Sequence, residues 1–85
     1  MPYKYKDLVY KGLKIMTEEL VLYPEIQEGV FTFWCMGHQF RYHVAKKDGE
    51  WDYQPLFLDA HRKVNRQVRG KLIAFAIATV KDRLS

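Results

Sequence analysis

The sequence predicts an α+β domain with the order α-β-β-β-α, in which two helices pack on one face of a three-stranded antiparallel meander. Two observations lead to this prediction. Apolar residues recur at helical spacing near both ends of the 85-residue chain, whereas aromatic and polar residues alternate in the middle. The dipeptide Asp48-Gly49, a strong hairpin signal, lies in that middle region. We expect a single domain over residues 1–85, because this length leaves no room for a second.

The first helix is expected over about residues 4–22. Apolar residues at steps of four and three mark one helical face: Val9, Leu13, Met16, Leu20 and Tyr23. Pro24 ends the segment, because the residue before a proline avoids helical backbone angles. Lysines begin this helix and glutamates end it, against the helix macrodipole, so packing of the apolar face must outweigh their cost.

Three strands are expected, over about residues 30–36, 39–46 and 50–54. Two-residue turns at Gly37-His38 and Asp48-Gly49 join them, so that Cys35 pairs with Phe40 in the first hairpin. Both hairpins then place aromatic and apolar side chains on one inward face: Phe31, Phe33, Cys35, Phe40, Tyr42, Val44, Trp51 and Tyr53. A one-residue slip in either hairpin would destroy this agreement. The opposite face is expected to stay open to solvent or to a partner.

The second helix is expected over about residues 59–83, with Asp59 as its N-cap. The segment Leu72–Val80 is apolar on every side, which predicts burial on every side. Such burial is hard to arrange in a small monomer, so this segment is also a candidate contact with a partner chain. Its alternation of large apolar residues with alanines leaves a strand open as an alternative, although alanine favours helix.

Basic residues gather at the start of the second helix, where positions 61–71 hold no acid: Arg62, Lys63, Arg66, Arg69 and Lys71. On one helix, Arg62, Arg66 and Arg69 would form a stripe with neighbours about 5–6 Å apart. The positive end of the helix adds to their charge and favours phosphate. We take these five residues as candidate nucleic-acid-binding residues. A solvated or salt-bridged face is the alternative.

The open face of the predicted sheet offers a second candidate surface. Four residues on it or at its margin are candidate partner-binding residues: Trp34, Arg41, His43 and Met36. Exposed tryptophan and arginine dominate protein interfaces, and on a sheet they also stack on bases. Burial of this face beneath a loop, or beneath Leu72–Val80, is the remaining alternative.

The order of elements and the start of the second helix resemble the double-stranded-RNA-binding domain. That family begins the helix with Lys-Lys-x-Ala-Lys, and Arg62-Lys63-Val64-Asn65-Arg66 keeps its three basic positions with Asn65 in place of alanine. The resemblance implies that Arg62, Lys63 and Arg66 contact phosphates across a major groove. Gly37-His38 stands where the family has Gly-Pro-x-His, without the proline or the spacing.

The same topology resembles the HicA-type ribonuclease toxins, which carry a Gly-Ser-His-like element at the first hairpin. This resemblance implies His38 as a general acid or base, because imidazole moves protons near neutral pH. The serine is missing, and no second acid or base stands beside His38. We therefore expect a binding module with no catalytic residues, and a HicA-like ribonuclease is the third hypothesis.

Composition narrows the function classes. A hydrophobic share of 48% excludes a disordered chain, and no apolar run approaches the roughly 20 residues of a membrane span. The histidines lack a metal-ligand spacing and no phosphate-binding glycine loop occurs, so neither metal nor cofactor is expected. The single cysteine, Cys35, fits a reducing cytoplasm.

A net charge of +4 permits a nucleic-acid partner without requiring one. The leading prediction is therefore a small, basic, cytoplasmic module that associates with nucleic acid. The alternative is a protein-binding adaptor or inhibitor, or a homodimeric regulator. That alternative would use the open sheet face and Leu72–Val80.

Overall fold

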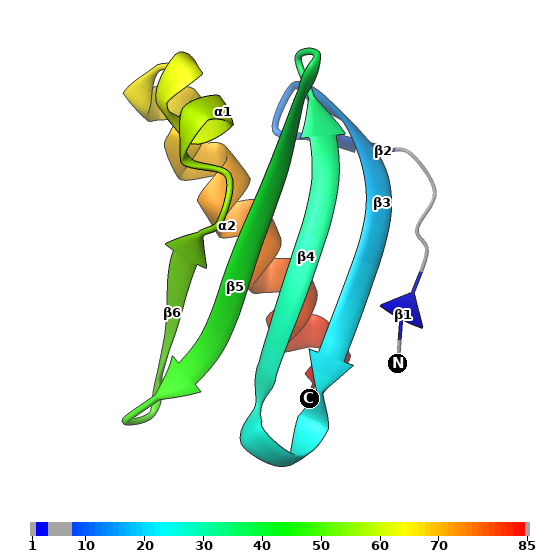
Figure 1. Ribbon diagram of the computed structural model, residues 1–85, viewed down its shortest axis with the longest axis vertical. Helices are drawn as coiled ribbons and strands as arrows, with labels where there is room; N and C mark the ends of the chain where they lie inside the picture. The colour runs from blue at the N-terminus through cyan, green and yellow to red at the C-terminus, as the bar shows by residue number, and fades with distance from the viewer. Residues whose placement is uncertain (1, 4–7, 85) are drawn as a thin grey trace.

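The computed structural model describes residues 2–3 and 8–84, which form an antiparallel sheet with one long helix across one face (Figure 1). The strands are β1 (Pro2–Tyr3), β2 (Leu8–Tyr10), β3 (Leu13–Tyr23), β4 (Glu28–Cys35), β5 (His38–Lys47) and β6 (Glu50–Pro55). The helices are the short 3-10 helix η1 (Pro24–Ile26), α1 (Leu58–Lys63) and α2 (Arg66–Leu84). The strand order is β1-β3-β4-β5-β6, and β2 also pairs with β3, so the sheet is five strands wide.

The α+β class is right, but the three-stranded meander between two helices is wrong. The predicted first helix, where the structure describes it, is β2 and β3 joined by a tight turn at Lys11-Gly12. Both turn residues have positive φ, 48° and 86°, as a two-residue hairpin turn of the type I′ class requires. Residues 4–7 of the predicted helix lie outside the described residues.

A β-bulge explains why β3 resembles a helix in sequence. Thr17 pairs with Phe33 and Glu19 pairs with Thr32, which leaves Glu18 as an extra residue. Inward positions therefore shift from odd to even numbers along the strand: Leu13, Ile15, Thr17, Leu20 and Leu22. Steps of two interrupted by a step of three imitate a helical pattern. Three residues of the predicted helical face are instead exposed: Val9, Met16 and Tyr23.

The predicted register is confirmed for β5 and β6, where Lys47 pairs with Glu50 across Asp48-Gly49. The predicted register between β4 and β5 is wrong by two residues, because the turn is Met36-Gly37. The type I′ turn favours glycine at its second central position, and the φ values are 51° for Met36 and 77° for Gly37. A two-residue shift preserves the faces, so the inward side chains of these strands remain inward.

The core lies between the inner face of the sheet and α2. Four aromatic side chains of β4 and β5 are almost fully buried: Phe31, Phe33, Phe40 and Tyr42. From α2, Phe75 meets Phe33 edge-on at a ring distance of 5.4 Å. Leu72–Val80 is helical, and Leu72, Phe75, Ala76 and Val80 are buried. The predicted inward Tyr53 is exposed, because it lies on the edge strand β6, which has a neighbouring strand on one side only.

The predicted second helix is broken after Lys63. Val64 is buried and extended, with φ −102° and ψ 154°, and links α1 to α2. The Asn65 side-chain oxygen then accepts a hydrogen bond of 2.8 Å from the Val68 N–H, which is the contact of an N-cap. Asp59 is not an N-cap, because α1 begins at Leu58. Neither α1 nor α2 is long and apolar enough to cross a membrane.

Candidate nucleic-acid interface

One end of the molecule gathers α1, the start of α2 and the turn between β2 and β3 (top of Figure 1). The Lys71 ammonium donates a hydrogen bond of 3.2 Å to the Lys11 carbonyl oxygen, which joins the start of α2 to that turn. We define the basic end as the cationic residues of these three segments: Lys11, Arg62, Lys63, Arg66, Arg69 and Lys71. Asp59 is the only acid in the same segments.

The break between α1 and α2 removes the predicted single stripe, because Arg62 lies in α1 whereas Arg66 and Arg69 lie in α2. Arg62, Lys63 and Arg66 are nevertheless exposed. Among the described residues, none of these three cations forms an ion pair with a carboxylate. The tertiary fold thus replaces the stripe with a broader cluster, to which Lys11 contributes from a segment predicted to be helical.

The remaining two predicted binding residues are partly used inside the fold. Lys71 holds the Lys11 carbonyl, as described above. Arg69 is half-buried, and its Nε is buried with no hydrogen-bond partner among the described residues. Burial raises the pKa of Tyr42, and the positive charge of Arg69 opposes that rise. Arg69 therefore acts on Tyr42 inside the fold and is less accessible to a ligand than Arg62, Lys63 and Arg66.

The positive charges of Arg69 and Arg62 also act on His61. Its Nδ1 and the Tyr42 hydroxyl share a hydrogen bond of 3.0 Å. Burial lowers the pKa of His61 from its ordinary value, and the charges of Arg69 and Arg62 lower it further. The neutral imidazole is therefore the form that the fold favours.

Acidification is expected to destabilise the protein through His61. Because the folded pKa lies below the ordinary 6.5, the unfolded chain binds the proton more readily. The free energy of unfolding should hold above pH 6.5 and fall as the pH drops from there toward the folded pKa. Urea midpoints at neutral and mildly acidic pH measure this change. His61→Gln should reduce the difference and His38→Gln should preserve it; equal pH dependence in both variants would contradict the assignment.

Three of the four predicted partner-binding residues, Trp34, Arg41 and His43, lie on the open face of the sheet, and Met36 lies in the turn beside it. Trp34 and Met36 are exposed, and with Met16, which pairs with Trp34 across β3 and β4, they line a hollow of about 410 Å³. We call these three residues the apolar patch. The Trp34 indole N–H donates to the Glu18 carboxylate, which holds the ring on the open face.

Arg41 and His43 instead make contacts within the fold. The Arg41 Nε–H donates to the Thr32 hydroxyl at 3.0 Å, and its guanidinium lies 5.5 Å from the centre of the Phe57 ring. His43 pairs with Glu28 at 2.9 Å. Sequence reasoning missed Met16 and Glu18, because both were assigned to a helix.

A pocket of about 480 Å³ adjoins the basic end, where the chain leaves the sheet for α1. We call it the edge pocket, and its lining residues are His38, Gln39, Leu56, Phe57, Leu58, Asp59, Ala60 and Lys63. Phe57 lies just before α1 and is 36% exposed. His38, the residue that the ribonuclease resemblance singles out, lies in this pocket. No sequence signal predicted the pocket, because it depends on where β6 ends beside β5.

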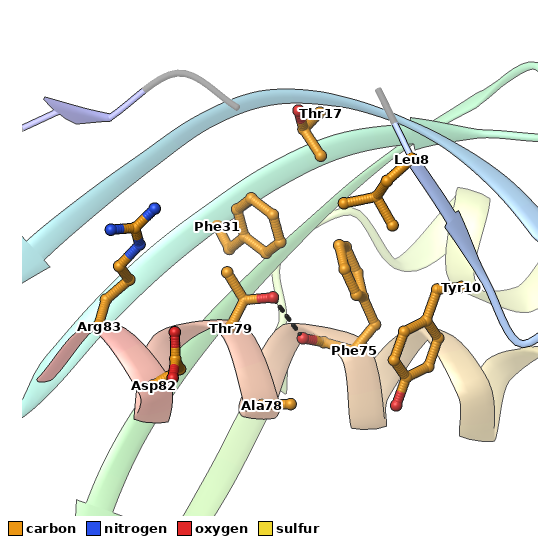
Figure 2. Close-up of a pocket in the computed structure, with 9 residues that line it drawn as sticks. All are labelled: Leu8, Tyr10, Thr17, Phe31, Phe75, Ala78, Thr79, Asp82 and Arg83. Carbon is orange, nitrogen blue, oxygen red and sulfur yellow. Dashed lines mark hydrogen bonds between the residues drawn. The ribbon is translucent and has the colours of Figure 1, made fainter. Parts of the chain in front are cut away.

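A further pocket of about 490 Å³ lies between the β2–β3 edge and the second half of α2. Figure 2 shows Leu8, Phe31 and Phe75 pointing into it, with Asp82 and Arg83 at one end. The Thr79 hydroxyl donates to the Phe75 carbonyl at 2.8 Å, so it serves the helix itself. Leu8 is the first described residue after positions 4–7, and the described residues therefore do not define the whole rim. We assign no site to this pocket.

Within residues 2–3 and 8–84, no three His, Cys, Asp or Glu side chains lie close enough together to hold a metal ion. Comparisons with known protein families, with curated proteins and with solved structures found no match to this chain.

Proposed function

We propose that this protein is a non-catalytic module of the cytoplasm that binds nucleic acid through the basic end. The observation that supports this proposal best is the set of exposed cations without carboxylate partners, Arg62, Lys63 and Arg66, beside Lys11 of the β2–β3 turn. Arginine binds phosphate through two parallel hydrogen bonds. Each phosphate that the protein neutralises also releases condensed counterions from the nucleic acid. The buried thiol of Cys35 suits a reducing compartment.

Removal of two exposed arginines is expected to weaken binding and its salt dependence together. In Arg62→Ala/Arg66→Ala, the slope of log affinity against log salt should become shallower by about 0.9 for each duplex phosphate that the protein no longer neutralises. Fluorescence anisotropy with a labelled DNA duplex, in salt from about 50 to 200 mM, measures this slope. Circular dichroism should show an unchanged fold, because both side chains are exposed.

Lys46→Ala/Lys47→Ala is the matched control, because it removes the same charge from exposed residues at the opposite end of the sheet (Figure 1). This control should keep most of the affinity and of the salt slope. If both double variants weaken binding equally, net charge rather than the basic end governs association. If the wild-type protein shows no binding at low salt, the proposed function is wrong.

The apolar patch favours a protein-binding adaptor as a second candidate. Met16, Trp34 and Met36 are 48%, 36% and 53% exposed on one margin of the open face. Tryptophan and methionine are enriched in protein interfaces. Raising the salt concentration distinguishes the two candidates. Nucleic acid should dissociate at high ionic strength, whereas a protein partner held by buried apolar surface should stay bound.

A further inference from the structure

The edge pocket contains an unused stretch of strand edge. The last pairing of β6 joins Pro55 to Tyr42, and the Leu56 N–H then donates to the Arg41 carbonyl at 2.7 Å. Beyond Leu56 the chain turns into α1, so the preceding residues of β5 pair with β4 but have no strand on their other side. Backbone groups alternate in direction along a strand, so the N–H and C=O of Gln39 point to the same side as the Arg41 carbonyl. Among the described residues, no backbone hydrogen bond joins Gln39 to the departing chain.

Three kinds of group therefore meet in the edge pocket. Gln39 offers one backbone donor and one backbone acceptor at its wall. Phe57 offers an aromatic ring that is 36% exposed and already accompanied by the Arg41 guanidinium. Lys63 offers a cation at the rim that continues into Arg62 and Arg66 of the basic end.

A nucleotide of a single strand matches this combination. Its base has a flat face for Phe57 and an edge with an adjacent donor and acceptor for Gln39, while its phosphates meet Lys63 and the basic end. A base inside a duplex has its faces stacked and its pairing edge occupied. An extended peptide fits less well, because the free edge offers it the backbone groups of one residue, Gln39, and strand addition depends on a row of such bonds.

We propose that the edge pocket binds one unpaired base of a single-stranded nucleic acid whose phosphates lie on the basic end. This inference rests on the proposed function and names its substrate class. A base that stacks on Phe57 is held through its flat face, so stacking strength sets the preference among bases. Adenine, which has two fused rings, is therefore favoured over thymine, which has one.

Anisotropy with three labelled DNA probes tests the inference: oligodeoxyadenylate and oligothymidylate of roughly 15 nucleotides, near the upper site size of single-strand binders, and a duplex of equal length. The wild-type protein should bind oligodeoxyadenylate most tightly. Phe57→Ala should weaken its binding by about five- to 150-fold, the range that follows from the loss of one base–aromatic stack. Its effect on the duplex should be small. Tyr23→Ala, which removes an exposed aromatic ring at the opposite end, is the matched control and should bind like wild type.

Asp59→Asn provides a second variant on an exposed side chain, which leaves the core untouched. It removes a carboxylate charge that lines the pocket together with Lys63, so it should strengthen the binding of both single-stranded probes. Equal affinity of the wild-type protein for duplex and single strand would overturn the inference, as would equal effects of Phe57→Ala and Tyr23→Ala. The proposed function would survive both results if Arg62→Ala/Arg66→Ala still weakened binding. A protein that binds none of the three probes would overturn both.

Discussion

Replacement of Phe33 by alanine is expected to lower the free energy of unfolding by about 3–5 kcal/mol, the usual cost of removing a buried phenylalanine ring. Phe33 is fully buried on β4, and its ring lies 5.4 to 5.9 Å from those of Phe40, Tyr42 and Phe75. Domains of this size have roughly 0.05–0.15 kcal/mol of stability per residue. The substitution therefore removes much of the total, and a large part of the population should be unfolded at 37 °C.

Urea titration followed by circular dichroism measures this loss. Phe33→Leu is the matched variant, because leucine keeps most of the apolar volume and should cost clearly less than alanine. An alanine variant with wild-type stability would show that α2 does not cover the inner face of the sheet.

Leu72→Ala is expected to cost about 2–5 kcal/mol, because Leu72 is fully buried where α2 packs against the sheet. This substitution also separates two interpretations of Leu72–Val80. If the segment packs inside one chain, truncation of Leu72 lowers the free energy of unfolding. If the segment joins two chains, the truncation dissociates the dimer and lowers the molecular mass in solution.

Urea midpoints together with light scattering at one protein concentration distinguish these outcomes. Ile73→Ala is the control from the neighbouring position, where the side chain is only half-buried and a smaller loss is expected. Unchanged stability with a halved mass after Leu72→Ala would contradict the packing seen here.

The sequence predicted the middle of the sheet well, because the signals there are local. Asp48-Gly49 imposes a two-residue turn, and alternating side chains impose the two faces. The turn before β5 was misplaced, because Met36 adopts a positive φ, which is uncommon for a residue other than glycine. The faces remained right because the error was two residues, a full period of the strand.

The first part of the chain was misread for a physical reason. The bulge at Glu18 shifts the inward positions of β3 by one residue, so neither a strand period nor a helix period fits the whole segment. Lys11-Gly12 is the signal that was available, because a residue followed by glycine between two apolar runs suits a hairpin turn. Similarly, Asn65 inside a presumed helix is a preferred N-cap residue and marks the start of α2.

Local pattern alone determined the α+β class, the inward aromatic face of β4 and β5, and the concentration of cations between positions 61 and 71. Only the tertiary structure decided which of those cations stay exposed, that Lys11 joins them, and that a pocket opens where β6 stops short of Gln39. Turn and strand preferences act between neighbouring residues, whereas exposure, charge clustering and free strand edges depend on packing between segments distant in the chain.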